Sequence, residues 1–223
     1  ILKSIVKQLK SLGGVVYLNG KATSEMKEAE IAKSLSMVMT EHIHPELMSC
    51  RDVVATGRYP YTGRLGILDK QDWKLVDEAI TMVHAEEVAE QSFTRISDGQ
   101  RQRVMLARAI CQDTAILVLD EPTSYLDIRY KLDILNSIRK LARERNIAVI
   151  MSLHELDLVQ KVSDMVACVD GTTVSHIGPP EEIFQGSLVQ KLYGIEEKNF
   201  DSMLGIMQMS GNKAAPNLSL IHI

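Results

Sequence analysis

Hydrophobic positions along this chain follow two spacings, one typical of strands and one typical of helices. Short apolar runs of strand length lie at residues 15–18, 36–39, 115–119, 148–153 and 165–169. Helical spacing is found at residues 1–12, 28–34, 69–89, 103–111, 128–146, 181–184 and 188–193. From residue 115 onward, strands and helices alternate. This alternation predicts an α/β fold with a mostly parallel sheet that is covered by helices on both faces.

Two of the predicted helices have clear apolar faces. The helix at 69–89 would bury Trp73, Val76, Ala79, Ile80 and Val83, and the helix at 128–146 would bury Ile128, Leu132, Leu135, Ile138 and Ala142. A tight turn is predicted at Asn19-Gly20. Beyond Gly194 the periodicity is lost, and we expect the tail at 196–223 to be poorly ordered.

The composition is that of a globular domain. The 223 residues are 45% hydrophobic and 24% charged, with a formal net charge of −4. No block of Lys and Arg suggests a nucleic-acid surface, and we interpret Arg101, Arg103 and Arg108 as a solvated helix face. His42 and His44 lack a nearby third ligand, so we expect no metal site there. The three cysteines are scattered, and we expect buried or inert thiols.

The strand predicted at 115–119 ends in two adjacent carboxylates, Asp120 and Glu121. Successive strand residues point to opposite sides, so the two carboxylates should face different environments. One can face Mg²⁺, which prefers hard oxygen ligands. The other can face a water molecule that attacks a γ-phosphate. A solvated strand end without a catalytic role is the alternative interpretation.

A second candidate feature is the run Ile96-Ser97-Asp98-Gly99-Gln100-Arg101-Gln102-Arg103. Ser97 is a favourable helix N-cap, and Gly99 permits a close approach of the backbone. The free N–H groups at a helix N-terminus favour an anion such as phosphate. Taken alone, this run is better explained as an ordinary capped helix. The two features in this order, with Ser124-Tyr125-Leu126-Asp127 after them, indicate an ATPase that works as a dimer.

These motifs resemble those of the ATP-binding subunits of ATP-binding cassette (ABC) transporters. The family signature L-S-G-G-Q corresponds to Ile96–Gln100, the Walker B strand with its glutamate to Ile116–Glu121, the D-loop to Ser124–Asp127, and the switch histidine to His154. The resemblance extends from residue 1 to about Tyr193. Asp98 in place of the first signature glycine, together with Gly57–Tyr61, resembles the branch that imports iron–siderophore, haem or cobalamin.

The resemblance implies a RecA-like P-loop NTPase core with a mostly parallel sheet, plus a helical insert subdomain. We expect residues 1–40 and 97–195 to form the core, 41–96 the insert, and 196–223 a tail. In the family, the first helix follows the Walker A phosphate loop, G-x-x-x-x-G-K-[ST], and that pattern does not occur in these 223 residues. We therefore expect the sequence to be an N-terminally truncated piece of a longer protein. Tyr59–Tyr61 would form either a surface that meets a membrane subunit or a rigid turn packed on the insert.

By the resemblance, two subunits pair head to tail, and each ATP lies between the Walker motifs of one subunit and the signature of the other. Ser97, Asp98, Gly99 and Gln100 would then approach the nucleotide in trans. A carboxylate close to a triphosphate would repel it. We therefore expect the side chain of Asp98 to point away from the phosphates.

Further roles follow from the same resemblance. Asp120 would hold Mg²⁺, and Glu121 would orient or deprotonate the attacking water. His154 would contact the γ-phosphate, and Asp127 would link the two nucleotide sites across the dimer. Thr40 stands where the family has a Gln that contacts Mg²⁺ and the water, so its shorter side chain would have to reach the nucleotide site.

The resemblance therefore predicts an ATPase that uses ATP and Mg²⁺ and works as a dimer. Its expected partners are transmembrane permease subunits and, indirectly, a substrate-binding protein, which places it on the cytoplasmic face of the cell membrane. The expected function is ATP hydrolysis coupled to import of iron(III)-siderophore or a related cofactor. One alternative is a non-transport ABC ATPase that acts on nucleic acid or ribosomes, which the acidic balance disfavours. The other is an inactive fragment that serves only as a folded module.

Overall fold

The computed structural model describes residues 1–39, 45, 47–63, 65–171, 173–184 and 218–222. The chain divides into two compact units, Ile1–Val149 and Ile150–Ile223. Thr40, His42, His44 and the helix predicted at 188–193 lie outside the described residues.

The first unit holds most of the regular structure. Its strands are β1 (Tyr17–Leu18), β2 (Lys21–Ala22), β3 (Leu35–Val38) and β4 (Ile116–Asp120). Its α-helices are α1 (Leu2–Ile5), α2 (Glu28–Ser34), α3 (Cys50–Ala55), α4 (Lys70–Met82), α5 (Asp98–Cys111) and α6 (Ile128–Arg145). Short 3₁₀ turns lie at η1 (Thr23–Glu25), η2 (Thr56–Tyr61), η3 (Glu86–Val88) and η4 (Phe93–Arg95). Strand β5 (Ala148–Leu153) begins where this unit ends.

Strands β3 and β4 are parallel neighbours, with Leu35 opposite Ile116 and Val38 opposite Leu119. The central residues of β4, Leu117, Val118 and Leu119, are fully buried. A strand covered on both faces needs an unbroken apolar run, which is the pattern that predicted β4. The strand therefore delivers Asp120 to its carboxyl end, at the edge of a buried sheet.

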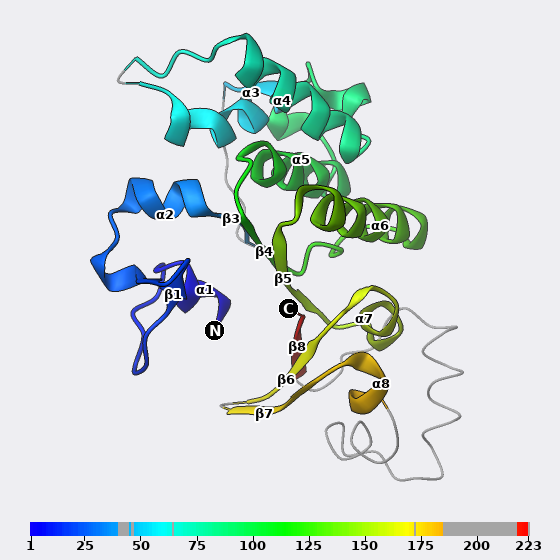
Figure 1. Ribbon diagram of the computed structural model, residues 1–223. Coiled ribbons are helices and arrows are strands. Elements are labelled where there is room, and N and C mark those ends of the chain that lie inside the picture. The colour runs from blue at the N-terminus through cyan, green and yellow to red at the C-terminus, as the bar shows by residue number, and fades with distance from the viewer. Residues whose placement is uncertain (40–44, 46, 64, 172, 185–217, 223) are drawn as a thin grey trace. The chain divides into compact units, whose positions relative to one another are not determined.

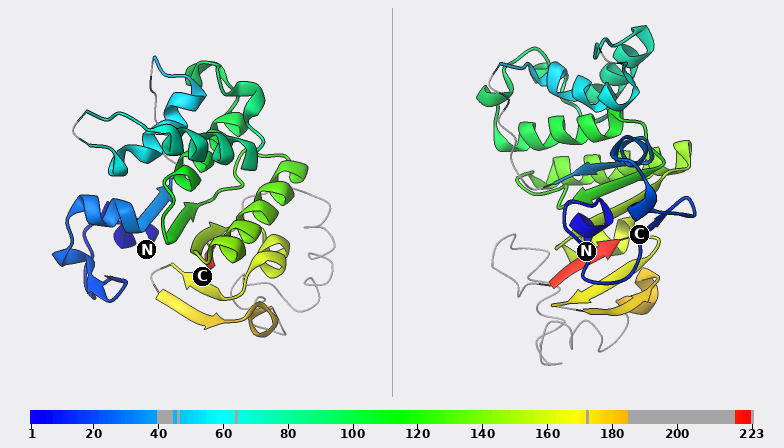
Figure 2. Two further views of the ribbon diagram at one scale, coloured as in Figure 1. Left: turned by 45° about the horizontal axis from the view of Figure 1, so that its top comes forward. Right: turned by 90° about the vertical axis from the view of Figure 1, so that its left-hand side faces the viewer.

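Helices α3, α4 and α5 pack against one another, as Figures 1 and 2 show. The apolar face predicted for α4 is confirmed, because Val76, Ala79 and Ile80 are buried. All three helices begin with an N-cap and a side chain three residues on that reaches back to it, Ser49/Asp52, Asp69/Asp72 and Ser97/Gln100. These local caps fix where each helix starts.

Three predicted helices differ from the structure. Helix α4 ends at Met82, before the predicted end at residue 89. Helix α1 ends at Ile5, because Leu9 and Leu12 are exposed and find no surface on which to bury an apolar face. Helix α6 has the predicted length, but its predicted face is wrong in the first turns, where Ile128 and Leu132 are exposed. Burial starts one turn later, at Ile134, Leu135, Ile138 and Leu141. The hairpin turn at Asn19-Gly20 is confirmed, and both residues have positive φ.

The second unit contains β6 (Val166–Asp170), β7 (Thr173–Gly178), β8 (Leu218–His222), α7 (Leu156–Val162) and α8 (Pro180–Ile183). Strands β6 and β7 are antiparallel neighbours. Strand β8 pairs antiparallel with both β5 and β6, so β5 and β6 run in the same direction. Strand β8 falls within the predicted tail at 196–223, for which no strand is predicted from the sequence.

Candidate functional site

The carboxylates predicted to do chemistry lie at the end of β4, where the chain turns sharply. The strand ends at Asp120, so Glu121 lies outside it and has a left-handed backbone with φ of 49°. Such a conformation costs a non-glycine residue about 1–3 kcal/mol. The turn at Glu121, rather than the alternation of a strand, therefore separates the two half-buried carboxylates.

A compact turn follows Glu121. The backbone N–H of Ser124 donates to the carbonyl of Glu121 at 3.1 Å, and the hydroxyl of Ser124 donates to Glu121 Oε2 at 2.9 Å. Tyr125 is also left-handed, with φ of 63°. Asp127 then caps α6, because its Oδ1 accepts from the N–H groups of Arg129 and Tyr130 at 3.1 Å each. The proposed link of Asp127 across a dimer stays a prediction beside this local cap.

The start of α5 is capped and accessible. Ser97 Oγ accepts from the N–H of Gln100 at 3.3 Å, and Gln100 Oε1 accepts from the N–H of Ser97 at 2.9 Å. Ser97 and Asp98 are exposed. Asp98 forms an ion pair with Arg101 on the next turn of its own helix. The first N–H groups of a helix have no partner within it, so this end can receive an anion.

Helix α5 rests directly on the turn that carries Glu121, within one chain. A Cβ added to Gly99 would lie 3.1 Å from the carbonyl oxygen of Tyr125, so any larger residue would push this backbone by a few tenths of an ångström. Gln102 Nε2 donates to the carbonyl of Glu121 at 3.4 Å. The guanidinium of Arg103 lies 4.6 Å from the ring centre of Tyr130. The two sequence features are therefore neighbours in space.

The interpretation of Arg101, Arg103 and Arg108 as a solvated helix face is wrong. Arg103 is only 5% exposed and donates to the carbonyl of His84 and to Glu87. Arg108 Nε donates to Thr56 Oγ1 at 2.8 Å, and burial lowers the pKa of Arg108. These partners come from distant segments of the sequence, and they tie α5 to the part of the chain predicted to be the insert.

Sequence reasoning also missed a buried clamp at Arg58. Its Nε donates to Asp72 at 2.9 Å, and its Nη1 donates to the carbonyls of Cys111 at 3.0 Å and Gln112 at 3.3 Å. Burial is the largest single influence and acts to raise the pKa of Asp72, but the hydrogen bond and charge of Arg58, together with a backbone hydrogen bond at Asp69, lower this pKa overall. Gly57 belongs to the same clamp, because an added Cβ would lie 2.3 Å from the carbonyl oxygen of Arg108.

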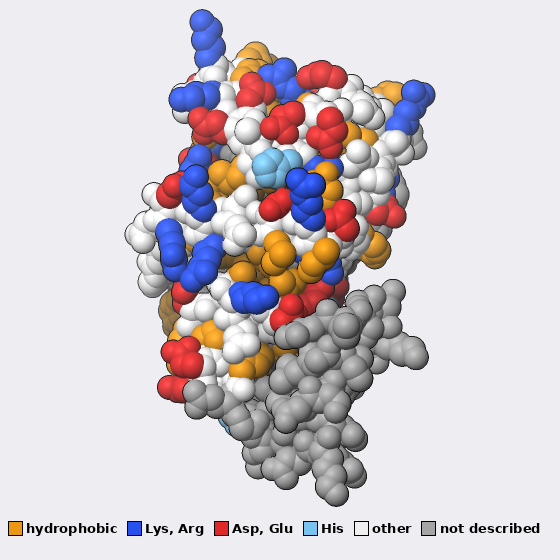
Figure 3. Space-filling model, turned by 90° about the vertical axis from the view of Figure 1, so that its right-hand side faces the viewer, with side chains coloured by type: hydrophobic (Ala, Val, Ile, Leu, Met, Phe, Trp, Pro, Cys, Tyr) orange, Lys and Arg blue, Asp and Glu red, His pale blue; other side chains and the backbone are white. Residues whose placement is uncertain are grey.

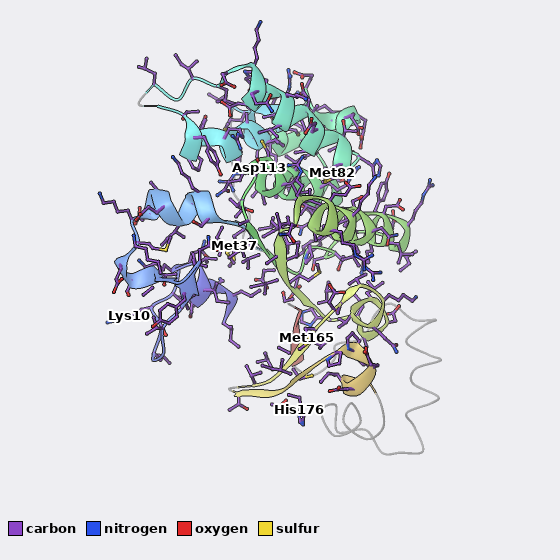
Figure 4. The ribbon with its side chains drawn as sticks, viewed as in Figure 1. Lys10, Met37, Met82, Asp113, Met165 and His176 are labelled. Atoms are coloured by element: carbon purple, nitrogen blue, oxygen red, sulfur yellow. The ribbon has the colours of Figure 1, made fainter. Side chains whose placement is uncertain are left out.

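Tyr59 and Tyr61 have different surroundings, and a contact of this segment with a membrane subunit stays a prediction. Tyr59 is 54% exposed. Tyr61 is 38% exposed, but its ring lies 4.1 Å from the guanidinium of Arg58 and its hydroxyl donates to the carbonyl of Asp113 at 3.3 Å. Asp113 lies just beyond Gln112, the C-cap of α5, and is labelled in Figure 4.

His154 and the three cysteines are the remaining residues singled out from the sequence. His154 is exposed in the segment between β5 and α7 of the second unit, and its role stays a prediction.

The thiols of Cys50, Cys111 and Cys168 are buried, as expected. Burial raises the pKa of Cys50 to about 11 and that of Cys111 to about 12, so both stay protonated at neutral pH.

A groove of about 910 Å³ runs between α4 and α6, but none of the predicted site residues lines it. Trp73, Met82 and Leu141 contribute apolar walls. Ion pairs such as Arg145–Glu78 cross it, and Figure 3 shows acidic and basic side chains interspersed on this side of the molecule. Among the residues that the structure describes, no helix is both long and apolar enough to span a membrane.

Comparison with known proteins identifies the family. The model of the ABC transporter family matches residues 1–124. An uncharacterized ABC transporter ATP-binding protein of Methanocaldococcus jannaschii is 39% identical over 95% of this chain and 73% of its own length. An iron(3+)-hydroxamate import ATP-binding protein of Bacillus subtilis is 32% identical over 88% of this chain and 73% of its own length.

A solved structure supports the same fold. A dimeric ATP-binding cassette in a post-hydrolysis state, bound to ADP and Pi, matches with a TM-score of 0.71 and 22% identity over 80% of this chain and 78% of its own. Together, the fold and the matches define an ABC ATPase cassette with a mixed α/β architecture. This chain belongs to the ABC transporter family.

Proposed function

We propose that this chain is the ATP-binding and ATP-hydrolysing subunit of an importer for iron(III)-siderophore or a related cofactor. The observation that carries the proposal is the pairing of Asp120 and Glu121, at the end of a buried strand, with the capped and accessible start of α5. The iron assignment draws on the relative whose name specifies iron(3+)-hydroxamate import.

The residues at the end of β4 fit a magnesium–nucleotide substrate. Mg²⁺ is commonly held by one or two carboxylates together with substrate phosphates and water, and Asp120 supplies one such carboxylate. When bound, the ion neutralises charge on the transferred phosphate. Glu121 is half-buried beside Asp120, where its carboxylate can orient the attacking water and accept its proton.

A second copy would complete each nucleotide site. The exposed start of α5, at Ser97–Gly99, would approach the γ-phosphate bound by the partner, in a head-to-tail dimer with two equivalent sites. His154 would contact the same phosphate, and Asp127 would connect the two sites. A dimeric solved relative supports this arrangement.

The insert offers a surface for permease subunits. Tyr59, Leu65 and Ile67 are exposed large apolar side chains in or just after η2. Docking of this surface on a permease would hold the subunit at the cytoplasmic face of the membrane. The role of Thr40 beside the nucleotide is part of the same proposal.

The hydrolytic role is tested with Glu121→Gln in the full-length protein, assembled with its permease. We expect the hydrolysis rate to fall by about 100-fold or more while ATP binding survives, because the amide cannot accept the proton of water. The rate and the ATP affinity are measured on the same preparation. Hydrolysis at the parental rate would refute the assignment.

The transported class is tested separately. Proteoliposomes that contain the full transporter and its binding protein are offered a ferric hydroxamate, haem or cobalamin, and ATP-dependent uptake is measured for each. We expect uptake of the ferric hydroxamate above the rate seen with Glu121→Gln. Uptake of none of the three would contradict the cofactor class and leave the ATPase assignment intact.

A further inference from the structure

We propose that Ser124 is a positioning residue for Glu121, whose carboxylate it holds in the orientation that acts on the attacking water. This inference rests on the proposed function, in which Glu121 works as the base. The observation behind it is the bond of 2.9 Å from Ser124 Oγ to Glu121 Oε2.

The bond from Ser124 stabilises one orientation of the Glu121 carboxylate. A glutamate side chain has several rotatable bonds, and fixing them costs conformational entropy. A hydroxyl donating to an ionised carboxylate is stronger than a bond between neutral groups, so it can offset much of this cost. Glu121 is half-buried and lies outside the regular strand, so side-chain contacts such as this one must define its orientation.

The backbone holds the hydroxyl of Ser124 in a fixed place. The N–H of Ser124 donates to the carbonyl of Glu121, and Gln102 Nε2 of α5 donates to the same carbonyl. Pro122 and Thr123, between the two residues, are buried. The turn therefore keeps its shape through the backbone and α5, and the hydroxyl of Ser124 is available to orient the carboxylate.

Because the backbone holds the turn and the hydroxyl holds the carboxylate, Ser124→Ala is a selective change. The alanine keeps the N–H that closes the turn and removes only the bond to the carboxylate. Ser124→Thr keeps a hydroxyl and serves as the conservative rescue. Ser49 supplies a matched control outside the site, because its Oγ also donates to a carboxylate three residues on, Asp52 Oδ2, at 2.7 Å.

The experiment measures kcat, the KM for ATP and the melting temperature in the full-length protein assembled with its permease. We expect Ser124→Ala to lower kcat by about 10-fold and to change KM by less than about twofold, because binding is untouched while orientation is lost. Ser124→Thr should restore kcat to within about threefold of the parent. Ser49→Ala should leave kcat unchanged, although it removes a helix cap.

A double variant connects the effect to Glu121. In the Glu121→Gln background, Ser124→Ala should lower the residual rate no further, since the two residues act as a unit. A parental or higher kcat in Ser124→Ala, a Ser124→Thr rate as low as that of Ser124→Ala, or an additive double variant would each overturn the positioning role alone. Absent hydrolysis in the parent, or a parental rate in Glu121→Gln, would overturn the proposed function and the positioning role with it.

Discussion

The turn at Glu121–Asp127 and the clamp at Gly57–Arg58 both pack against α5, yet they hold their polar groups in different ways. The clamp is buried, and Arg58 satisfies a carboxylate and two carbonyls at once. The turn is half-exposed and contains two left-handed residues, Glu121 and Tyr125. The clamp is held by hydrogen-bonded polar groups, whereas the turn retains a strained backbone.

The difference fits the tasks of the two regions. A strained and accessible carboxylate persists only where the surrounding structure over-determines it. Helix α5 provides that support, because its C-terminal end is locked by Arg58 while its N-terminal half contacts the turn through Gly99 and Gln102. The clamp thus stabilises the frame on which the reactive turn depends.

Removing the clamp should produce the largest loss of stability. Arg58→Ala leaves Asp72 as a buried carboxylate without its cation, and breaking such a pair costs about 3–5 kcal/mol. This loss is the difference in the free energy of unfolding between parent and variant, measured by urea titration. Lys74→Ala, which breaks the exposed Lys74–Glu78 pair, is the control and should cost less than about 1 kcal/mol. Equal losses in the two variants would contradict a special role for the clamp.

A methyl group at Gly57 should disturb the packing of η2 on α5 beside the clamp. Gly57→Ala forces the carbonyl of Arg108 to move, and overpacking of this kind costs about 1–3 kcal/mol. Gly63→Ala is the matched control, because nothing lies within 4 Å of its added Cβ. If thermal unfolding gave the two variants the same melting temperature, the close packing of η2 on α5 would be wrong.

The strain in the turn can be separated from its chemistry. Glu121→Gly should raise the free energy of unfolding by up to about 1 kcal/mol, since glycine tolerates positive φ, while hydrolysis is lost. Asn146→Gly relaxes another left-handed residue, the C-cap of α6, and should leave hydrolysis unchanged. A Glu121→Gly protein that is less stable than the parent would show that the side chain stabilises the turn more than the strain costs.

Lowering the pH should reduce the free energy of unfolding more in the parent than in a variant without the Asp72 carboxylate. The pKa of Asp72 is lower in the folded state, so the folded protein binds fewer protons than the unfolded chain as the pH falls. The stabilisation from Asp72 is therefore complete above the ordinary Asp pKa and is lost as the pH falls towards the lowered one. Asp72→Asn should show a flatter dependence of unfolding free energy on pH in this acid range, and an unchanged slope would contradict the pair.

Local signals predicted much of the fold. The apolar run of β4 and the Ser97 cap of α5 depend on neighbours within a few residues, so their residue types already indicate them. Arg103 was misinterpreted because its partners, His84 and Glu87, lie 19 and 16 residues upstream. The contact of Gln102 with Glu121 likewise depends on how α5 packs across the end of β4. Such non-local contacts cannot be inferred from spacing along one chain.

The central claim is that the start of α5 on one copy serves the carboxylates of another, and mixing two inactive variants tests it most directly. Ser97→Arg places a bulky side chain at an exposed position, whereas Glu121→Gln disables the base. A mixed head-to-tail dimer has one intact site, so an equal mixture should regain up to about one quarter of the parental hydrolysis rate. A rate no higher than the average of the two single variants would contradict the shared site.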